Sequence, residues 1–105
     1  NSQNNFEVLS QEDVKLIEKL GATFEEVSND EKLKLGIDYG MKIVDLKRGK
    51  LMDKGIREGF IITDIDKNPV RSTDDINNLL SEKRGGVLIE GVYPNGKRNY
   101  YAIGM

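Results

Sequence analysis

Two aspartates, Asp64 and Asp66, are the closest approach to a catalytic pair in this chain. Residues i and i+2 of a strand point to the same face, and two neighbouring carboxylates can share acid–base work or bind a metal ion. No third ligand or pocket-forming partner follows them, and aspartates at strand ends commonly face water. We therefore expect a solvated pair here, with no catalytic or metal site.

The residue types on which most enzymes rely are missing. The 105 residues include no histidine and no cysteine. Their absence excludes Ser–His and Cys–His relays, thiol nucleophiles, disulfides and zinc sites of the usual ligand types. No cluster of acids or lysines replaces them. We expect that this fragment is not an enzyme and that it uses no cofactor.

A different chemistry is indicated by the glycine-punctuated stretch 35–46, LGIDYGMKIVDL. Gly36 and Gly40 permit a turn with positive φ, and such a turn directs backbone N–H groups into a concavity that suits a terminal carboxylate. Met41 and Ile43 then alternate as in a strand, to which an extended peptide could add. The simpler interpretation is a tight loop before an ordinary core strand. The pattern alone does not distinguish this loop from a carboxylate-binding turn.

Length and charge narrow the remaining functions. A chain of 105 residues holds one domain with one modest core. Its 16 Lys and Arg are interspersed with 18 Asp and Glu, for a net charge of −2, so nucleic acid is not expected as a partner. No apolar run approaches the ~18 residues of a membrane span and no signal peptide is visible, so we expect no membrane insertion.

Alternating apolar residues bounded by turn formers predict the strands around this stretch. They lie at residues 21–27, 41–46, 60–66, 87–93 and 97–103, with a short strand restarting at Val70. Phe24, on the first of them, should anchor the core. Pro94-Asn95-Gly96 predicts a hairpin between the last two.

One longer helix is predicted at residues 73–83. Ser72 is a strong N-cap, and Asp74 and Asp75 suit the first turn because the helix dipole favours negative charge there. Residues three and four apart share a stripe. Thr73, Asn77 and Leu80 share one such stripe.

The other helical predictions are shorter. Residues 50–54 form a short helix that ends at a glycine and buries Leu51 and Met52. Residues 28–35 form one helical turn or a loop. Residues 1–18 form a linker or a short lead-in, with a short helix as the open alternative.

Three short motifs connect these elements. They are x-Φ-G-Φ-x-Φ at Asp38, Tyr39, Gly40, Met41, Lys42 and Ile43, the spaced glycines Gly49, Gly55-Ile56 and Gly59 before Ile61 or Ile62, and Val70-Arg71-Ser72 ahead of the longer helix. With the element order, they resemble a PDZ domain of the kind found in bacterial HtrA/Deg-family serine proteases, over residues 19–105. Phe60 stands where that family usually has an aspartate, and Leu51 and Met52 replace its small residues.

The resemblance implies a mainly β fold with two helices. The fold would be a partly open antiparallel β-barrel or sandwich, capped by one longer and one short helix. It also implies a site that binds peptide and its carboxylate. That site would comprise Asp38, Tyr39, Gly40, Met41, Lys42, Ile43 and Val44, with Thr73, Asn77 and Leu80 on the helix. Flexible Met41 and large Leu80 predict a medium-sized apolar terminal side chain as the ligand.

The implied function is that of a regulatory, peptide-binding module of a larger HtrA-like serine protease in the periplasm. It would capture C-termini or extended, unfolded segments of substrate proteins by strand addition, with the protease domain of the parent chain as a second partner. One alternative is a structural or allosteric domain that packs against neighbouring domains or subunits without binding free peptide. Another is the PDZ module of a different protease, such as a membrane metalloprotease or a processing peptidase.

Overall fold

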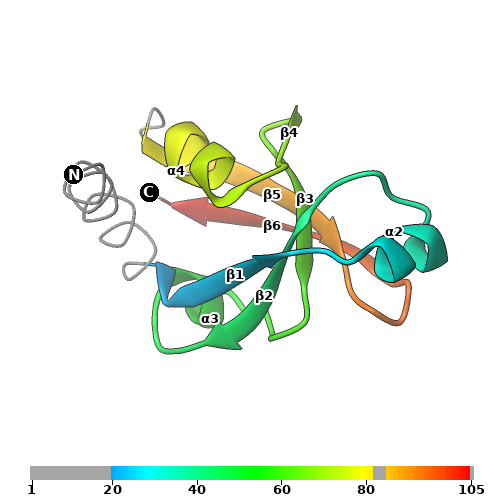
Figure 1. Cartoon of the computed structure of the whole chain (residues 1–105). Coiled ribbons are helices and arrows are strands. Elements are labelled where there is room, and N and C mark those ends of the chain that lie inside the picture. Colours follow the sequence, from blue (N-terminus) through cyan, green and yellow to red (C-terminus); the bar gives the residue numbers. More distant parts are fainter. Residues whose placement is uncertain (1–19, 82–84, 105) are drawn as a thin grey trace, which may run out of the picture.

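A computed structural model of the chain describes residues 20–81 and 85–104 (Figure 1). In chain order the elements are β1 (Ala22–Glu26), α2 (Asn29–Leu35), β2 (Met41–Leu46), α3 (Lys50–Asp53), β3 (Ile61–Ile65), β4 (Asn68–Pro69), α4 (Thr73–Ser81), β5 (Gly86–Val92) and β6 (Arg98–Gly104). The predicted lead-in 1–18 lies outside the described residues. None of the described helices is both long enough and apolar enough to cross a membrane.

One antiparallel sheet contains all the strands of the described residues. Its order is β1-β2-β3-β5-β6, with β4 paired to β3 off this path. Because β1 and β6 each pair on one side only, the sheet does not close into a barrel. The predicted partly open, mainly β fold is confirmed.

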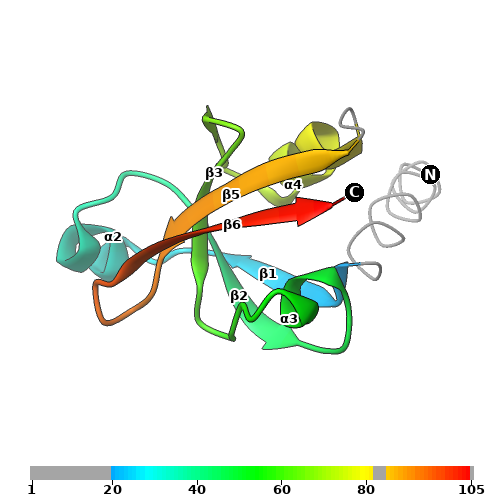
Figure 2. The same cartoon turned by 180° about the vertical axis from the view of Figure 1, so that it is seen from behind.

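The sheet is strongly twisted, so that β1 and β2 cross in front of β5 and β6 in Figure 1. α4 lies on the upper side, above β1 and in front of β5. Figure 2 shows the reverse view, in which β5 passes in front of α4 and α3 lies below β6. α4 therefore faces β1 on one side and β5 on the other.

α2 is longer than the single turn or loop that the sequence predicts. Ser28 caps its start, because the Glu31 N–H donates to the Ser28 hydroxyl at 3.2 Å and the hydroxyl donates back to the Glu31 carboxylate at 3.3 Å. Gly36 ends it in the left-handed conformation with φ 68°. Caps at both ends stabilise a helix that charge-rich composition alone leaves ambiguous.

The predictions for the other helices largely hold. In α4 the Asp75 N–H donates to the hydroxyl of Ser72 at 3.2 Å, as expected of an N-cap. In α3 Leu51 is buried, but Met52 is 42 % exposed, which corrects the expectation that both are buried. Neighbouring helical residues point about 100° apart, so a single turn turns only one of them inward.

The core centres on Phe60, which is completely buried. Its ring lies 4.8 Å from that of Tyr93 and 5.4 Å edge-on from that of Tyr101, between ring centroids; such pairs add about 0.5–1.5 kcal/mol beyond burial. Phe24 is only half-buried against this cluster, which corrects its expected role as the core anchor. The reason is that β1 is an edge strand.

The turn between β3 and β4 begins earlier than the sequence predicts. Asp66 and Lys67 both have positive φ, at 50° and 69°, the conformation of a tight two-residue hairpin. The short strand therefore lies at Asn68–Pro69 rather than restarting at Val70. The predicted hairpin between β5 and β6 is confirmed, with the Tyr93 N–H donating to the Lys97 carbonyl at 2.9 Å.

Candidate functional site

β2 contains most of the residues predicted to bind peptide, and the structure places it inside the sheet. It pairs with β1 from Met41 to Leu46 and with β3 at its start. Ile43 donates its N–H to the Phe60 carbonyl at 2.9 Å, and its own carbonyl accepts from the Gly59 N–H at 2.8 Å. Both edges of β2 are therefore already paired within the sheet. The prediction that a peptide adds as a strand at Met41–Val44 is wrong.

Gly40 also has a different role from the predicted one. It is buried, with φ 149°, and a Cβ at this position would lie 2.7 Å from Cγ2 of Ile61. Its carbonyl accepts from the Val27 N–H at 3.4 Å. Glycine is therefore needed here so that the start of β2 can approach β3.

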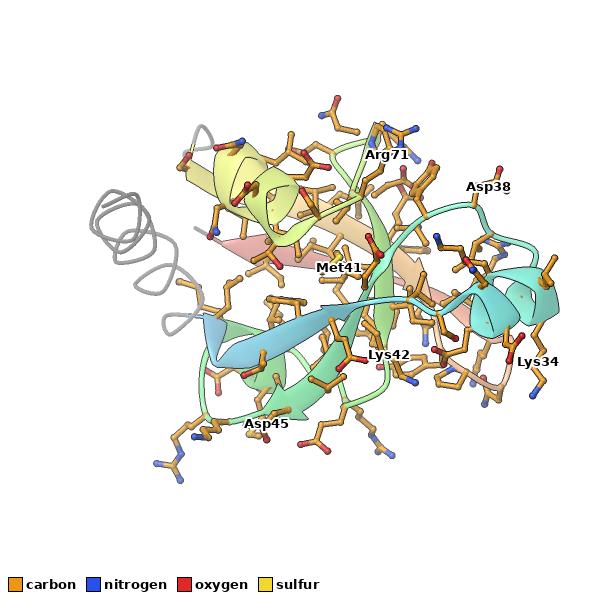
Figure 3. All side chains as sticks on the ribbon, viewed as in Figure 1. Lys34, Asp38, Met41, Lys42, Asp45 and Arg71 are labelled. Atoms are coloured by element: carbon orange, nitrogen blue, oxygen red, sulfur yellow. The ribbon has the colours of Figure 1, made fainter. Side chains whose placement is uncertain are left out.

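The residues around Gly40 divide between two faces of the strand. The inward set is Tyr39, Met41 and Ile43, and the outward set is Asp38, Lys42 and Val44. Figure 3 shows Met41 and Lys42 on opposite sides of the paired strands. A one-residue step reverses the face in any strand, so these residues do not form one site.

Tyr39 is held by contacts within the domain. Its hydroxyl donates to the Asp64 carboxylate at 3.3 Å, and the Arg71 guanidinium lies 4.9 Å from the centre of its ring. Burial, with the neighbouring Asp64 charge, raises the pKa of Tyr39 above 10.0. The neutral hydroxyl therefore remains a hydrogen-bond donor at physiological pH.

Lys42 is occupied as well. Its ammonium forms an ion pair with Glu31 of α2 at 2.7 Å. The hydrogen bond from Lys42 holds the pKa of Glu31 below its usual value of 4.5. The pair ties α2 to the outer face of β2.

Asp64 and Asp66 each accept hydrogen bonds from other parts of the domain. Asp64 accepts from Tyr39 and from the Thr63 hydroxyl at 3.0 Å, whereas Asp66 accepts from the Leu88 N–H at 2.8 Å. Both are half-buried and hydrogen-bonded, so the expectation of simply solvated carboxylates is corrected. The described residues hold no group of three or more His, Cys, Asp or Glu side chains that could bind a metal ion.

Hydrogen bonds at the two ends of β1 show in which direction its backbone N–H and C=O groups point. The Gly21 carbonyl accepts from the Lys47 N–H at 2.7 Å, and the Val27 N–H donates to the Gly40 carbonyl. Both groups point toward β2 and its flanking residues. Because the N–H and C=O of one strand residue point the same way and alternate along the strand, odd-numbered residues of this segment face β2.

The even-numbered residues Ala22, Phe24 and Glu26 therefore direct their N–H and C=O groups away from β2. No strand of the described residues pairs with this side of β1. The side chains of Ala22 and Phe24 turn into the domain, while those of Thr23 and Glu25 are exposed. β1 thus offers a free main-chain edge, and the side chains of Ala22 and Phe24 on this edge still belong to the core.

The start of β1 packs closely against the backbone of residues 47–49. Gly21 has φ 79°, and a Cβ there would lie 2.6 Å from the Lys47 carbonyl oxygen. A Cβ on Gly49 would likewise lie 2.6 Å from the carbonyl oxygen of Leu20. Two backbone segments are therefore in direct contact at the point where an added strand would end.

Sequence reasoning missed this edge although the signal is present. The motif x-Φ-G-Φ-x-Φ occurs not only at 38–43 but also at Lys19, Leu20, Gly21, Ala22, Thr23 and Phe24. Both copies lead into a strand. Only the sheet order shows that the earlier copy leads into the edge strand and the later one into an interior strand.

The helix residues of the predicted site lie on one stripe of α4. Asn77 and Leu80 are buried and Thr73 is half-buried. Leu80 packs in the main core cluster with Ile76. Two of the three predicted helix residues are therefore buried inside the domain.

No family model and no curated protein matches the sequence. Solved structures do match its fold. The HtrA-type protease AlgW with a decapeptide matches with TM-score 0.63 and 20 % identity, over 81 % of this chain and 27 % of that chain. A variant of AlgW with a decapeptide gives TM-score 0.65 and 21 % identity, over 91 % and 33 %.

A third solved structure, an isolated PDZ domain, is matched over almost its whole length. The PDZ domain of EpsC from Vibrio cholerae matches with TM-score 0.55 and 12 % identity, over 83 % of this chain and 97 % of that domain. The chain has the PDZ fold. It spans about a third or less of the AlgW chains, and identities this low establish the fold alone.

Proposed function

We propose that this PDZ-fold domain binds extended polypeptide, C-termini in particular, by adding it as a strand to the free edge of β1. The observation that carries the proposal is the outward direction of the main-chain groups of Ala22, Phe24 and Glu26. Main-chain hydrogen bonds of this kind give affinity that depends little on sequence. Alternate side chains of the added strand would face α4 and give specificity.

The terminal carboxylate would lie at the start of β1. An added strand that runs antiparallel to β1 ends beside Ala22, where the chain turns at Gly21 with positive φ. Close packing of this turn against residues 47–49 holds its backbone in one conformation. A preorganised backbone loses little entropy on binding, which favours affinity.

We further propose that the domain is a regulatory module of a longer, exported HtrA-like serine protease. The support is the shared fold with AlgW, whose solved structures contain a decapeptide. In this role the module would present substrate C-termini or unfolded segments to a protease domain elsewhere in the parent chain. A domain of the parent that docks on the same β1 edge is the competing role.

Amide hydrogen exchange tests the proposal residue by residue. In the free domain, the amides of Phe24 and Glu26 should exchange fast and those of Thr23 and Glu25 slowly. A free-acid apolar peptide should slow exchange at Phe24 and Glu26 alone of the four. A peptide amide of the same sequence should protect them less.

The second edge strand supplies the control. By the same alternation, Tyr100 of β6 directs its N–H outward, because Lys97 faces β5. Its exchange should not change when peptide is added. Protection at Tyr100 with none at Phe24 would move the site to β6, and protection at neither would favour the docking role.

A further inference from the structure

A cleft opens between the loop that follows α3 and the β5–β6 hairpin, with a volume of about 560 Å³. Arg57 lines it from the loop, and Lys97 and Asn99 line it from the hairpin. A volume of this size is typical of sites that hold whole small molecules. None of the residues that line the cleft belongs to β1 or α4. It is therefore separate from the edge at which we propose that peptide is added.

The cleft is positively charged, although the chain as a whole has a net charge of −2. Arg57 and Lys97 are its two cations, and no residue that lines it is Asp or Glu. Neither cation forms an ion pair with a residue of the ranges 20–81 and 85–104. Glu58, which follows Arg57 in the chain, accepts instead from the Leu46 N–H at 3.1 Å. Both cations can therefore bind an anion that enters from solvent.

Two tyrosine hydroxyls supply a further donor in the cleft. The hydroxyls of Tyr93 and Tyr101 lie 2.8 Å apart, and the Tyr93 oxygen also accepts from the Arg57 N–H at 3.2 Å. Two hydroxyls carry two protons and their mutual hydrogen bond uses one, so the other has no acceptor among the described residues. Burial, followed by the hydrogen bond with Tyr93, raises the pKa of Tyr101 to about 12. The spare proton therefore stays in place at neutral pH, where a ligand can accept it.

We propose that this cleft binds the phosphate group of a small molecule. A phosphate monoester carries a charge of about −1.5 to −2 at pH 7, which the two cations match. The guanidinium of Arg57 can pair with two phosphate oxygens, and the ammonium of Lys97 binds as a point charge. The spare tyrosine proton can donate to a third oxygen. A carboxylate has one charge and two oxygens, so it would leave part of this set of donors unused.

The size and walls of the cleft favour a phosphate that carries an organic group. Pro94 and the rings of Tyr93 and Tyr101 line the cleft together with the two cations. They offer apolar surface beside the phosphate, and an aromatic or aliphatic group can pack there. A phosphomonoester should therefore bind more tightly than the free phosphate ion.

Three probes, followed by the chemical shifts of backbone amides in NMR titrations, test the proposal. Phenyl phosphate should bind with a Kd in the millimolar range or below and shift the amides of Arg57, Lys97 and Asn99, but not that of Phe24 in β1. Benzoate has the same ring with a carboxylate and should bind about tenfold more weakly. Inorganic phosphate should shift the same amides. Weaker binding of inorganic phosphate would identify a phosphomonoester as the ligand, and equal binding would identify the free ion.

Two arginine variants locate the site. Arg57→Gln removes a cation of the cleft and should weaken phenyl phosphate about tenfold or more. Arg98→Gln removes an arginine of β6 that does not line the cleft, and it should leave Kd unchanged. Both arginines are exposed, and the two variants change the net charge equally. A difference between them therefore reports the position of the charge rather than its amount.

Three results would overturn the proposal. If neither phosphate probe shifts the amides of Arg57, Lys97 and Asn99, the cleft does not bind phosphate. If both arginine variants weaken binding equally, the attraction is a general effect of charge. If benzoate binds as tightly as phenyl phosphate, the cleft does not select a phosphate group. Each of these results leaves strand addition at β1 untouched, because β1 contributes no residue to the cleft.

Discussion

Gly49 and Leu20 are in backbone contact: a Cβ on Gly49 would lie 2.6 Å from the Leu20 carbonyl oxygen. Gly49 has φ 170°, an extended conformation that any residue adopts, so the requirement for glycine is purely steric. This contact joins the start of α3 to the turn before β1. It positions the end of the edge at which we propose that peptide is added.

Gly49→Ala should therefore destabilise the domain through overpacking alone. We expect a loss of about 1–3 kcal/mol in the free energy of unfolding, measured by urea denaturation. Peptide affinity should fall as well, because the turn at Gly21 must shift. Gly104→Ala is the control, since a Cβ there meets nothing within 4 Å. Equal stability of the two variants would contradict the steric account.

Gly40→Ala tests the corrected role of the second glycine. The added Cβ meets Ile61 at 2.7 Å, and φ is 149°, which L side chains rarely adopt. Overpacking and strain each cost about 1–3 kcal/mol, out of a total stability of about 5–15 kcal/mol for a domain of this kind. The variant should be clearly less stable in denaturant. An unchanged stability with lost peptide binding would instead restore Gly40 to a carboxylate-binding turn.

Proline at neighbouring positions of β1 distinguishes its two main-chain edges. Glu26→Pro removes an N–H that points away from β2, so the domain should stay folded and lose affinity for peptide. Glu25→Pro removes an N–H that points toward β2. It should cost about 1–3 kcal/mol of stability through a broken ladder bond.

Both positions have exposed glutamates, so the lost side chains are matched. Denaturation and peptide titration of the two variants provide the readouts. A more destabilising change at Glu26 than at Glu25 would show that the assigned directions are reversed.

The ion pair between Glu31 and Lys42 predicts a pH dependence. Lys42 lowers the pKa of Glu31 in the folded state below 4.5, so the pair contributes stability above that pH and loses it as the pH falls through the folded pKa. Because the pair is partly exposed, its contribution should be under about 1 kcal/mol.

The stability difference between wild type and Glu31→Gln should therefore be present at pH 7 and should be lost as the pH falls below 4.5 and through the lowered pKa of Glu31. It should also shrink at high salt. A difference that grows on acidification would contradict this sign.

Local chemistry determined much of this fold. Asn95 and Gly96 mark the β5–β6 hairpin, Ser72 caps α4, and the alternating residues of 41–46 form a strand, as predicted. Each of these features depends on residues close together in sequence, where turn geometry, capping and alternation act directly.

The site depended on distant contacts. The sequence carries the glycine motif twice, before β1 and before β2, and nothing local distinguishes Gly21 from Gly40. Their roles differ because β2 is enclosed by β1 and β3 while β1 remains at the edge. Likewise, Asn77 lies on a stripe that the sequence predicts, but its burial, with no hydrogen-bond partner among the described residues, follows from how α4 packs on the sheet. Strand order and packing join residues far apart in the chain, and only the tertiary structure decides which backbone groups and which polar side chains remain unpaired.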